Sequence, residues 1–398
     1  DQGEHGAALE PALNVRALLV ELYRELNDAQ AQRGSAGKRV DLWPRIVESL
    51  ASFLLQLMRP ALGSKGALDL YVLAPGSLRV LPLTGLRVGD QPLLGLFRSV
   101  SHLPALKFAD PMFPQPPAQR TACLFASSEA SEGMLEFGRA AIKTLRRALP
   151  AYSVEPRRPE QFRGSDVVEN DAIQAIAPDL ARLRLYGQGT VVSATATEAA
   201  LLLSQGRALS TRNIMDPLPR CDLVEIWAAT AGINPSVYAA ADEEDRLPGL
   251  VPAYLQCGAR GVIDLAWPVF DLVKALVCER FGLIQPRLEL PSAEALAQAV
   301  LWTQRLLSDW ADARGEHIGV RGALVWLDHA RRAAVTALGG DPQWVEPFSG
   351  LAEHPLLQNM SVEELISETR HPSHLAAFRY WGGLHRAPAA SSEAPHSE

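Results

Sequence analysis

The chain has 398 residues, a hydrophobic fraction of 47%, a charged fraction of 21% and a net charge of -7. These values are typical of an ordinary globular protein with one large domain or two. Because the net charge is negative, the protein as a whole has no positive electrostatic potential that would attract nucleic acid or an anionic membrane surface. Because no apolar stretch reaches the ~18 residues of a spanning helix, we expect neither a nucleic-acid partner nor a membrane.

The cysteines predict a reducing environment. The sequence has four of them and no C-x-x-C pair: Cys123, Cys221, Cys257 and Cys278. Isolated thiols in apolar surroundings indicate buried structural cysteines in a cytoplasmic protein, without a zinc site or a disulfide framework. No Gly-rich phosphate loop joins a strand to a helix, so we expect no nucleotide and no other cofactor.

The first 66 residues are predicted to form a helical extension. Apolar residues recur at helical spacing over 14–26 and again over 41–62, which predicts an N-terminal helical hairpin. The chain begins at Asp1 without a methionine or a signal segment. We therefore expect it to be a mature fragment, an expressed portion or a piece of a longer protein.

Residues 67–386 are predicted to form one α/β domain. Strands are predicted at 70–73, 78–81, 122–126, 190–192, 199–203, 223–227 and 261–265, the first two as a β-hairpin. Helices are predicted at 129–149, 167–186 and 247–256. This alternation of strands and helices predicts a mostly parallel central sheet with helices on both faces.

The C-terminal part is predicted to add helices to this domain. Ser292 is expected to cap a helix that ends near residue 313, and a second helix is expected over 321–337. Ser361 and Glu364 have the spacing of a capping box. A last strand is predicted at 375–381, and the small, polar tail 387–398 is predicted to be disordered.

The segment 221–232 has the pattern of a strand that ends at an active site. The apolar run 223–227 is followed by small residues and by Gly232. The carboxyl ends of parallel strands are where α/β domains usually carry their functional residues. However, the loop 228–232 contains no side chain that could act as a strong nucleophile.

Acidic residues near this strand allow two interpretations. Asp222, Glu225, Asp264 and Asp271 could line a specificity pocket for basic side chains of a substrate, with Asp222 and Asp264 as its main candidates. Alternatively, these residues pair with arginines or cap helices. The late histidines His371 and His374 lack the spacing of a metal site.

Five separated stretches follow one another in a set order. They are the hairpin 72–83 with 100–104, the Ala-Thr-Glu-Ala-Ala-Leu of 196–201, the Asp-Leu-Val of 222–224 with Gly232 and Leu250, the Gly-Ala-Arg-Gly-Val of 258–262 with Trp-Pro-Val at 267–269, and His371-Pro372 with 376–378. Together they resemble the CHAT family of bacterial caspase-like cysteine peptidases. The resemblance implies a caspase-like α/β/α sandwich with a cysteine and a histidine at the ends of adjacent strands.

In this resemblance both catalytic positions are replaced. Ala229 stands at the cysteine position and Gln205 at the histidine position, while the oxyanion and substrate groove corresponds to Gly206, Thr230 and Gly232. A methyl group cannot act as a nucleophile. A neutral amide has no nitrogen that titrates near neutral pH and cannot act as a general base.

Three functions remain open at this point. Natural loss of both residues predicts a pseudo-peptidase of a bacterial defence or signalling system, which binds a protein or peptide partner without cutting it. Alternatively, the chain is a cysteine endopeptidase in which the histidine at position 205 and the cysteine at position 229 have been substituted. The third possibility is a scaffold whose groove is unused. CHAT relatives commonly occur beside sensor or repeat modules, so such an upstream module is an expected partner.

Overall fold

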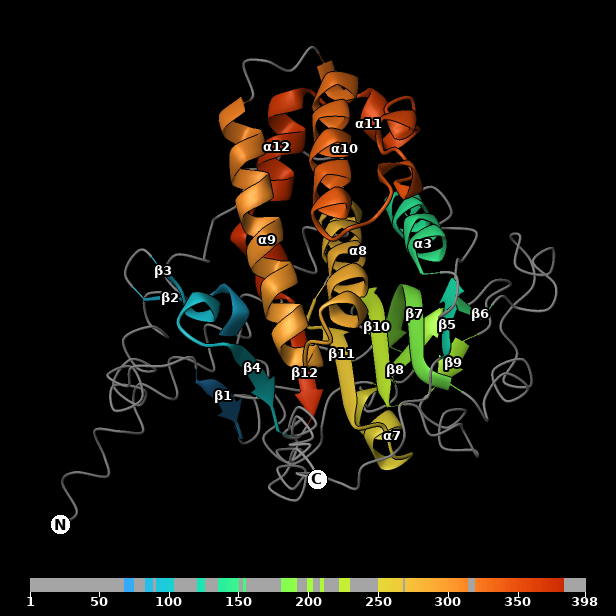
Figure 1. Ribbon diagram of the computed structural model, residues 1–398, viewed down its shortest axis with the longest axis vertical. Helices are drawn as coiled ribbons and strands as arrows, with labels where there is room; N and C mark the ends of the chain where they lie inside the picture. Colours follow the sequence, from blue (N-terminus) through green and yellow to red (C-terminus); the bar gives the residue numbers. More distant parts are fainter. Residues whose placement is uncertain are drawn as a thin grey trace, which may run out of the picture.

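A computed structural model of the chain describes residues 68–74, 83–88, 91–103, 120–125, 135–149, 153–154, 180–191, 199–202, 208–210, 222–229, 250–267, 269–313 and 319–382. These residues form a ten-stranded sheet with a group of helices packed at one end of it (Figure 1). The predicted helical hairpin of 1–66, the predicted strand 78–81 and the tail 387–398 lie outside the described residues.

The main sheet has the strand order β1-β4-β12-β11-β10-β7-β5-β6, and β8 and β9 branch from β7. The strands of this sheet are β1 (Asp69–Val72), β4 (Ser99–His102), β5 (Arg120–Phe125), β6 (Ser153–Val154), β7 (Leu180–Val191), β8 (Ala199–Leu202), β9 (Ala208–Ser210), β10 (Leu223–Ala229), β11 (Gly261–Leu265) and β12 (Phe378–Gly382). A separate two-stranded sheet consists of β2 (Arg87–Val88) and β3 (Gln91–Pro92).

The sheet is mostly parallel, as predicted. β11, β10, β7, β5 and β6 run in one direction. β12 is antiparallel to β11 but parallel to β4, which is parallel to β1. The β7–β8 and β8–β9 pairs are antiparallel. Because parallel strands end at the same edge, the carboxyl ends of β7, β10 and β11 lie next to one another.

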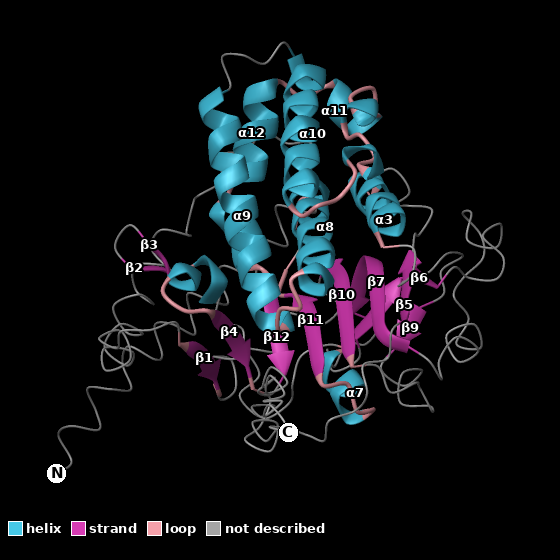
Figure 2. Cartoon of the chain, in the orientation of Figure 1, coloured by secondary structure: helices cyan, strands magenta, loops and turns pink. Residues whose placement is uncertain are grey.

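The longer helices gather beyond one end of the strands, and α7 lies near the other end (Figure 2). The helices are α3 (Glu136–Ala148), α7 (Val251–Gln256), α8 (Asp271–Arg287), α9 (Ser292–Asp312), α10 (Gly319–Ala337), α11 (Pro355–Gln358), α12 (Val362–Arg370) and α13 (Pro372–Ala376), with short turns η2 (Leu83–Gly85), η3 (Leu93–Gly95), η12 (Pro342–Trp344) and η13 (Ser349–Leu351). α8 packs against both α3 and α9. It is buried on nearly every side, which explains why its sequence has no single apolar face.

Both faces of the central strands are buried. Trp227, Ile263 and Leu265 belong to the hydrophobic cluster that includes α8 and α9. Successive side chains of a strand point to opposite faces, and the alternating residues Ile226 and Val262 are also almost fully buried. This burial on two faces fits the layered α/β class predicted from the sequence.

Several predicted elements are confirmed. β11 has the predicted bounds, β10 is two residues longer than predicted, and α10 begins two residues earlier than predicted. The capping box is present: the hydroxyl of Ser361 accepts a hydrogen bond from the Glu364 amide at 3.1 Å, and the Glu364 carboxylate accepts one from the Ser361 amide at 2.8 Å.

Other predictions were wrong in detail. Residues 180–186 were predicted to be helical, but they belong to β7. Ser292 does not cap α9, since it is the first helical residue and Pro291 precedes it. β1 pairs with β4 in parallel, and the strand 78–81 that was predicted to form a hairpin with it lies outside the described residues. The last strand begins at Phe378, because 372–376 form α13.

Candidate site at the carboxyl edge of the sheet

The candidate site lies where β7 and β10 end their parallel pairing. Gln188 on β7 is the register partner of Ala229, the last residue of β10. On its other side, β10 shifts register against β11, because Glu225 pairs with Ile263 but Ala229 pairs with Leu265. Four residues of β10 thus span two of β11. Such bulges change the direction of a strand and are frequent next to functional sites.

Of the residues predicted to form the catalytic edge, the structure describes one. Ala229 is at the end of β10, whereas Thr230, Gly232 and the dipeptide Gln205-Gly206 lie outside the described residues. In sequence, Gln205 falls between β8 and β9, which pair with each other in antiparallel fashion. The strand that is parallel to β10 and next to it is β7.

Sequence reasoning did not single out Gln188. The chain contains two Gln-Gly dipeptides, Gln188-Gly189 and Gln205-Gly206, so the residue types alone do not distinguish them. Because a helix was predicted over 167–186, the sequence did not indicate that Gln188 lies on a strand parallel to β10. The pairing register distinguishes the two dipeptides, because it places Gln188 opposite Ala229 on the strand next to β10.

A buried ionic cluster joins β7 to β10 below this edge. The carboxylate of Glu225, which is fully buried, accepts hydrogen bonds from Arg184 at 2.6 and 3.0 Å and from the Trp227 indole at 2.8 Å. Arg182 lies 3.3 Å from the same carboxylate. Burial lowers the pKa of Arg182 to about 10, although Glu225 opposes this shift. A one-residue slip of β7 would leave these charges buried without partners, so the cluster disfavours such a slip from the register that aligns Gln188 with Ala229.

A second polar cluster lies where two helices begin. Asp271, the first residue of α8, accepts hydrogen bonds from the Tyr186 hydroxyl at 2.8 Å and from the Gly138 amide near the start of α3 at 3.1 Å. The buried Lys274 ammonium lies 3.4 Å from Asp271 and donates to the Gly187 carbonyl at 3.5 Å. A carboxylate at two helix N-termini is favourable. The cluster therefore holds β7 at Tyr186 and Gly187, directly before Gln188, against α3 and α8.

Replacing Tyr186 with phenylalanine is expected to lower the free energy of unfolding by about 1–2 kcal/mol, because a buried acceptor on Asp271 loses its hydroxyl donor. Urea denaturation measures this change. Tyr71→Phe is the matched control, since Tyr71 is less buried and its hydroxyl has no hydrogen-bond partner among the described residues. Equal effects of the two variants would contradict a stabilising role for the Tyr186–Asp271 hydrogen bond.

Asp222 lies at the opposite edge from Ala229. It precedes β10, and a strand of seven further residues places it roughly 20 Å from the carboxyl end. Its carboxylate accepts a hydrogen bond from the Arg260 Nε at 2.8 Å. Asp222 is therefore part of an ion pair at the amino end of the strand.

Asp264 is also paired with an arginine. Its carboxylate accepts two hydrogen bonds from Arg379, one of them at 3.0 Å from Nε, and one from the Trp381 indole at 2.9 Å. The carboxylates of Asp222 and Asp264 thus both have arginine partners. This is the arrangement that the sequence left open as the alternative to a specificity pocket.

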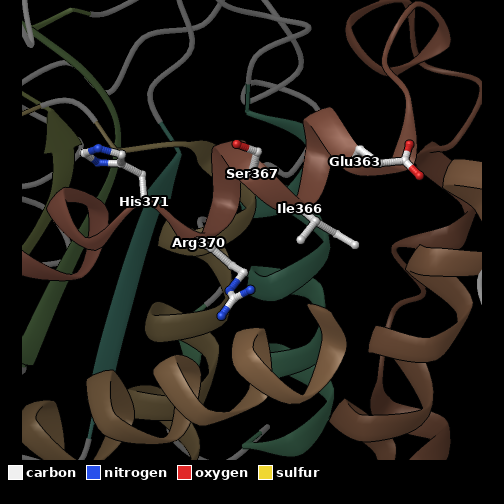
Figure 3. A pocket seen from close by; sticks show the side chains of 5 residues that line it. All are labelled: Glu363, Ile366, Ser367, Arg370 and His371. Atoms are coloured by element: carbon white, nitrogen blue, oxygen red, sulfur yellow. The ribbon is translucent and has the colours of Figure 1, made fainter. Parts of the chain in front are cut away.

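A separate hollow of about 410 Å³ lies along α12. It is lined by Glu363, Ile366, Ser367, Arg370 and His371, whose side chains are spaced along the helix and its C-terminal end (Figure 3). None of them belongs to β7 or β10. The described residues contain no group of three or more histidine, cysteine or acidic side chains that could hold a metal ion, and none of their helices is long and apolar enough to cross a membrane.

The fold and the edge residues define an α/β protein whose candidate site lies at the ends of two adjacent parallel strands. The family model of the CHAT domain matches residues 44–384, so the chain belongs to the CHAT-domain family. This confirms the resemblance drawn from the ordered motifs. The match begins within the segment that was predicted to be a separate extension.

Other comparisons add little. Among solved structures, the chain is similar to the Arg-specific cysteine proteinase gingipain R, with 8% sequence identity and a TM-score of 0.38. The similarity covers 65% of this chain and 63% of the gingipain chain, which is less than two thirds of that protein. No curated protein matches the sequence.

Proposed function

We propose that this chain is a catalytically silent CHAT protein that binds a protein or peptide partner without cleaving it. In this proposal Ala229 occupies the nucleophile position, and Gln188, in place of Gln205, occupies the position of the general base. The observation that carries the proposal is the register, which aligns these two residues where the parallel pairing of β7 and β10 ends. Neither residue type can supply the thiolate or the titrating nitrogen that peptide cleavage of this kind requires.

The two cysteines whose side chains the structure describes, Cys257 and Cys278, offer no substitute nucleophile. Cys257 follows α7 and precedes β11, so it lies at the amino edge of the sheet, and burial raises the pKa of its thiol. Cys278 is fully buried within α8. A thiol with a raised pKa, or one without access to substrate, is a poor nucleophile. Both cysteines are therefore better explained as structural residues.

The biological setting is proposed by analogy alone. Other CHAT proteins commonly occur in bacterial stress, defence or signalling systems beside sensor or repeat modules. By this analogy the chain acts in the cytoplasm as the binding part of such a system, with an upstream module as one partner. The alternative function is that of a cysteine endopeptidase whose two catalytic residues have been substituted. It requires that the parent gene has a histidine codon at position 188 and a cysteine codon at position 229.

The proposal is tested by cleavage and by binding. A mixture of random decapeptides incubated with the native chain is expected to remain uncut when it is analysed by mass spectrometry. Peptides selected for binding are expected to bind at least about tenfold more weakly to Thr230→Arg, because this bulky charge directly follows β10 at the carboxyl edge. Asp222→Asn, at the other end of the same strand, is the matched control and is expected to bind normally.

Two results would overturn this proposal. If the native chain cleaves peptides and still does so after Gln188 or Ala229 is substituted, the catalytic centre lies elsewhere. Binding that is unchanged in Thr230→Arg would favour the scaffold function, because the carboxyl edge would then be unused.

A further inference from the structure

One face of α12 carries two opposite charges without partners. Glu363 and Arg370 are both exposed, and neither forms an ion pair with any residue that the structure describes. The hollow of about 410 Å³ lies along this face. Figure 3 shows Ile366 and Arg370 on one side of the helix and Ser367 on the other. The exposed side chains and the hollow define a surface to which another molecule has access.

The spacing of the two charges prevents them from pairing within the helix. Seven residues are about two turns, so Glu363 and Arg370 project in directions that differ by only about 20°, and they are about 10.5 Å apart along the axis. Ion pairs within a helix form between residues three or four positions apart. Both charges therefore remain available to a partner on the same side of the helix.

The helix dipole explains the signs of these charges but not their common face. An acidic side chain in the first turn and a basic one in the last turn stabilise a helix at any position around its axis. Here the two charges flank Ile366, which lines the hollow and is only 7% exposed. An apolar residue between charged residues is the arrangement of a small interface with an apolar centre and a polar rim.

The order of residues on this face is complementary to itself. Glu363, Ile366, Ser367 and Arg370 lie symmetrically about the midpoint between positions 366 and 367. If a second α12 runs antiparallel to the first, with a twofold axis through this midpoint, Glu363 of each copy faces Arg370 of the other, and Ile366 faces Ser367. The antiparallel arrangement also places the amino end of each helix next to the carboxyl end of the other, so the helix dipoles attract.

We propose that this face of α12 is a self-association surface through which two copies of the chain form a symmetric dimer. Each copy supplies the charges that the other lacks, and the ridge of side chains on each helix packs into the hollow beside the other helix. A contact made by one short helix per copy is at the low end of specific interfaces, so the expected Kd is on the order of 10–100 µM. This surface belongs to α12, so the dimer does not depend on the function proposed for the sheet edge.

Sedimentation velocity of the full chain between about 5 and 300 µM, a range that brackets this Kd, measures the association. Glu363→Arg and Arg370→Glu are each expected to weaken it at least about tenfold, because like charges then face each other across the twofold axis. Arg146→Glu is the matched control. Arg146 is an exposed residue of α3, and its reversal changes the net charge as much as Arg370→Glu does. This control is expected to associate like the native chain.

Reversing both charges restores the complementarity. The double variant Glu363→Arg/Arg370→Glu is expected to associate as the native chain does, although both of its charges oppose the helix dipole. An equimolar mixture of the two single variants is expected to form heterodimers, although neither variant associates alone. Circular dichroism verifies the helix content of each protein. The mixture decides the question even if the double variant does not fold.

Several results would overturn the proposal. They are a native chain that stays monomeric over the whole concentration range, single variants that associate normally, and a mixture of the single variants that stays monomeric. Foreign peptides that bind the native chain but not Arg370→Glu would contradict a second copy as the occupant of this face. Thr230→Arg is expected to leave the association unchanged, so failure of one proposal does not decide the other.

Discussion

Replacing Gln188 with histidine and Ala229 with cysteine in the same chain is expected to create a thiol that ionises near neutral pH. An imidazole opposite the new thiol would stabilise the thiolate, because the two residues are register partners on adjacent strands. A fall of the thiol pKa from about 8.5 to about 7 raises the thiolate fraction at pH 6 by about 30-fold. The pH dependence of alkylation by iodoacetamide measures this change.

Two controls make this prediction specific. Ala229→Cys alone is expected to keep an ordinary thiol pKa. Ala229→Cys combined with Gln205→His tests the position that the sequence favoured, and it is also expected to keep an ordinary pKa. A lowered pKa in the Gln205→His combination only would show that the general base position is 205, contrary to our assignment. If the thiol pKa is lowered in neither combination, the result would contradict the assignment of these strand ends as the family's catalytic edge.

Acid is expected to destabilise the protein through His102. This histidine, at the end of β4, is fully buried, lies with its ring 5.0 Å from that of Trp381, and has no partner for its Nε2 among the described residues. Burial, with a further contribution from the Arg379 charge, lowers the pKa of His102 from 6.5 to about 3. The imidazole therefore stays neutral in the folded protein over a range in which the unfolded chain protonates it.

The direction of the pH effect follows from this difference. Above pH 6.5 the histidine is neutral in both states and costs nothing, and as the pH falls from 6.5 toward 3 the unfolded state alone gains a proton. The folded protein therefore loses about 1.4 kcal/mol of stability per pH unit, or roughly 2–3 kcal/mol on reaching pH 4.5. Urea denaturation at pH 7 and pH 4.5 measures this loss.

His102→Phe is the matched variant because it keeps a ring next to Trp381 but cannot titrate. Its stability is expected to fall much less between the two pH values. Carboxylates also lose stabilising interactions in acid: the hydrogen bond from Arg98, for example, holds the pKa of Asp69 below its usual value. These losses occur in both proteins and cancel in the comparison. Equal pH dependence of the two proteins would contradict the assigned role of His102.

The sequence predicted the elements whose signals are local. Short, mostly apolar runs marked β10 and β11, and the spacing of Ser361 and Glu364 marked the start of α12. β7 was missed in part because its inward-facing positions include Arg182 and Arg184, which are polar. These arginines are tolerated in the interior only because Glu225, distant in sequence, pairs with them. The order of polar and apolar residues along β7 does not reveal a pairing with a residue that is distant in sequence.

The candidate site was predictable in the same partial way. The end of β10 and the replacement at Ala229 follow from residues that are adjacent in sequence. Its partner position depends on which strand lies beside β10 and in which register, and the sequence alone left two Gln-Gly dipeptides to choose from.

The position of β12 affects how the protein can be made. Among the described strands, β1 and β4 join the rest of the main sheet only through β12, which lies at residues 378–382. The two parts of the sheet therefore cannot bond to each other until that late segment has left the ribosome. Until then β4 and β11 have open edges, which readily pair with strands of other chains. Aggregation is thus a greater hazard during translation than after folding, and a nonsense mutation upstream of Phe378 is expected to yield insoluble protein.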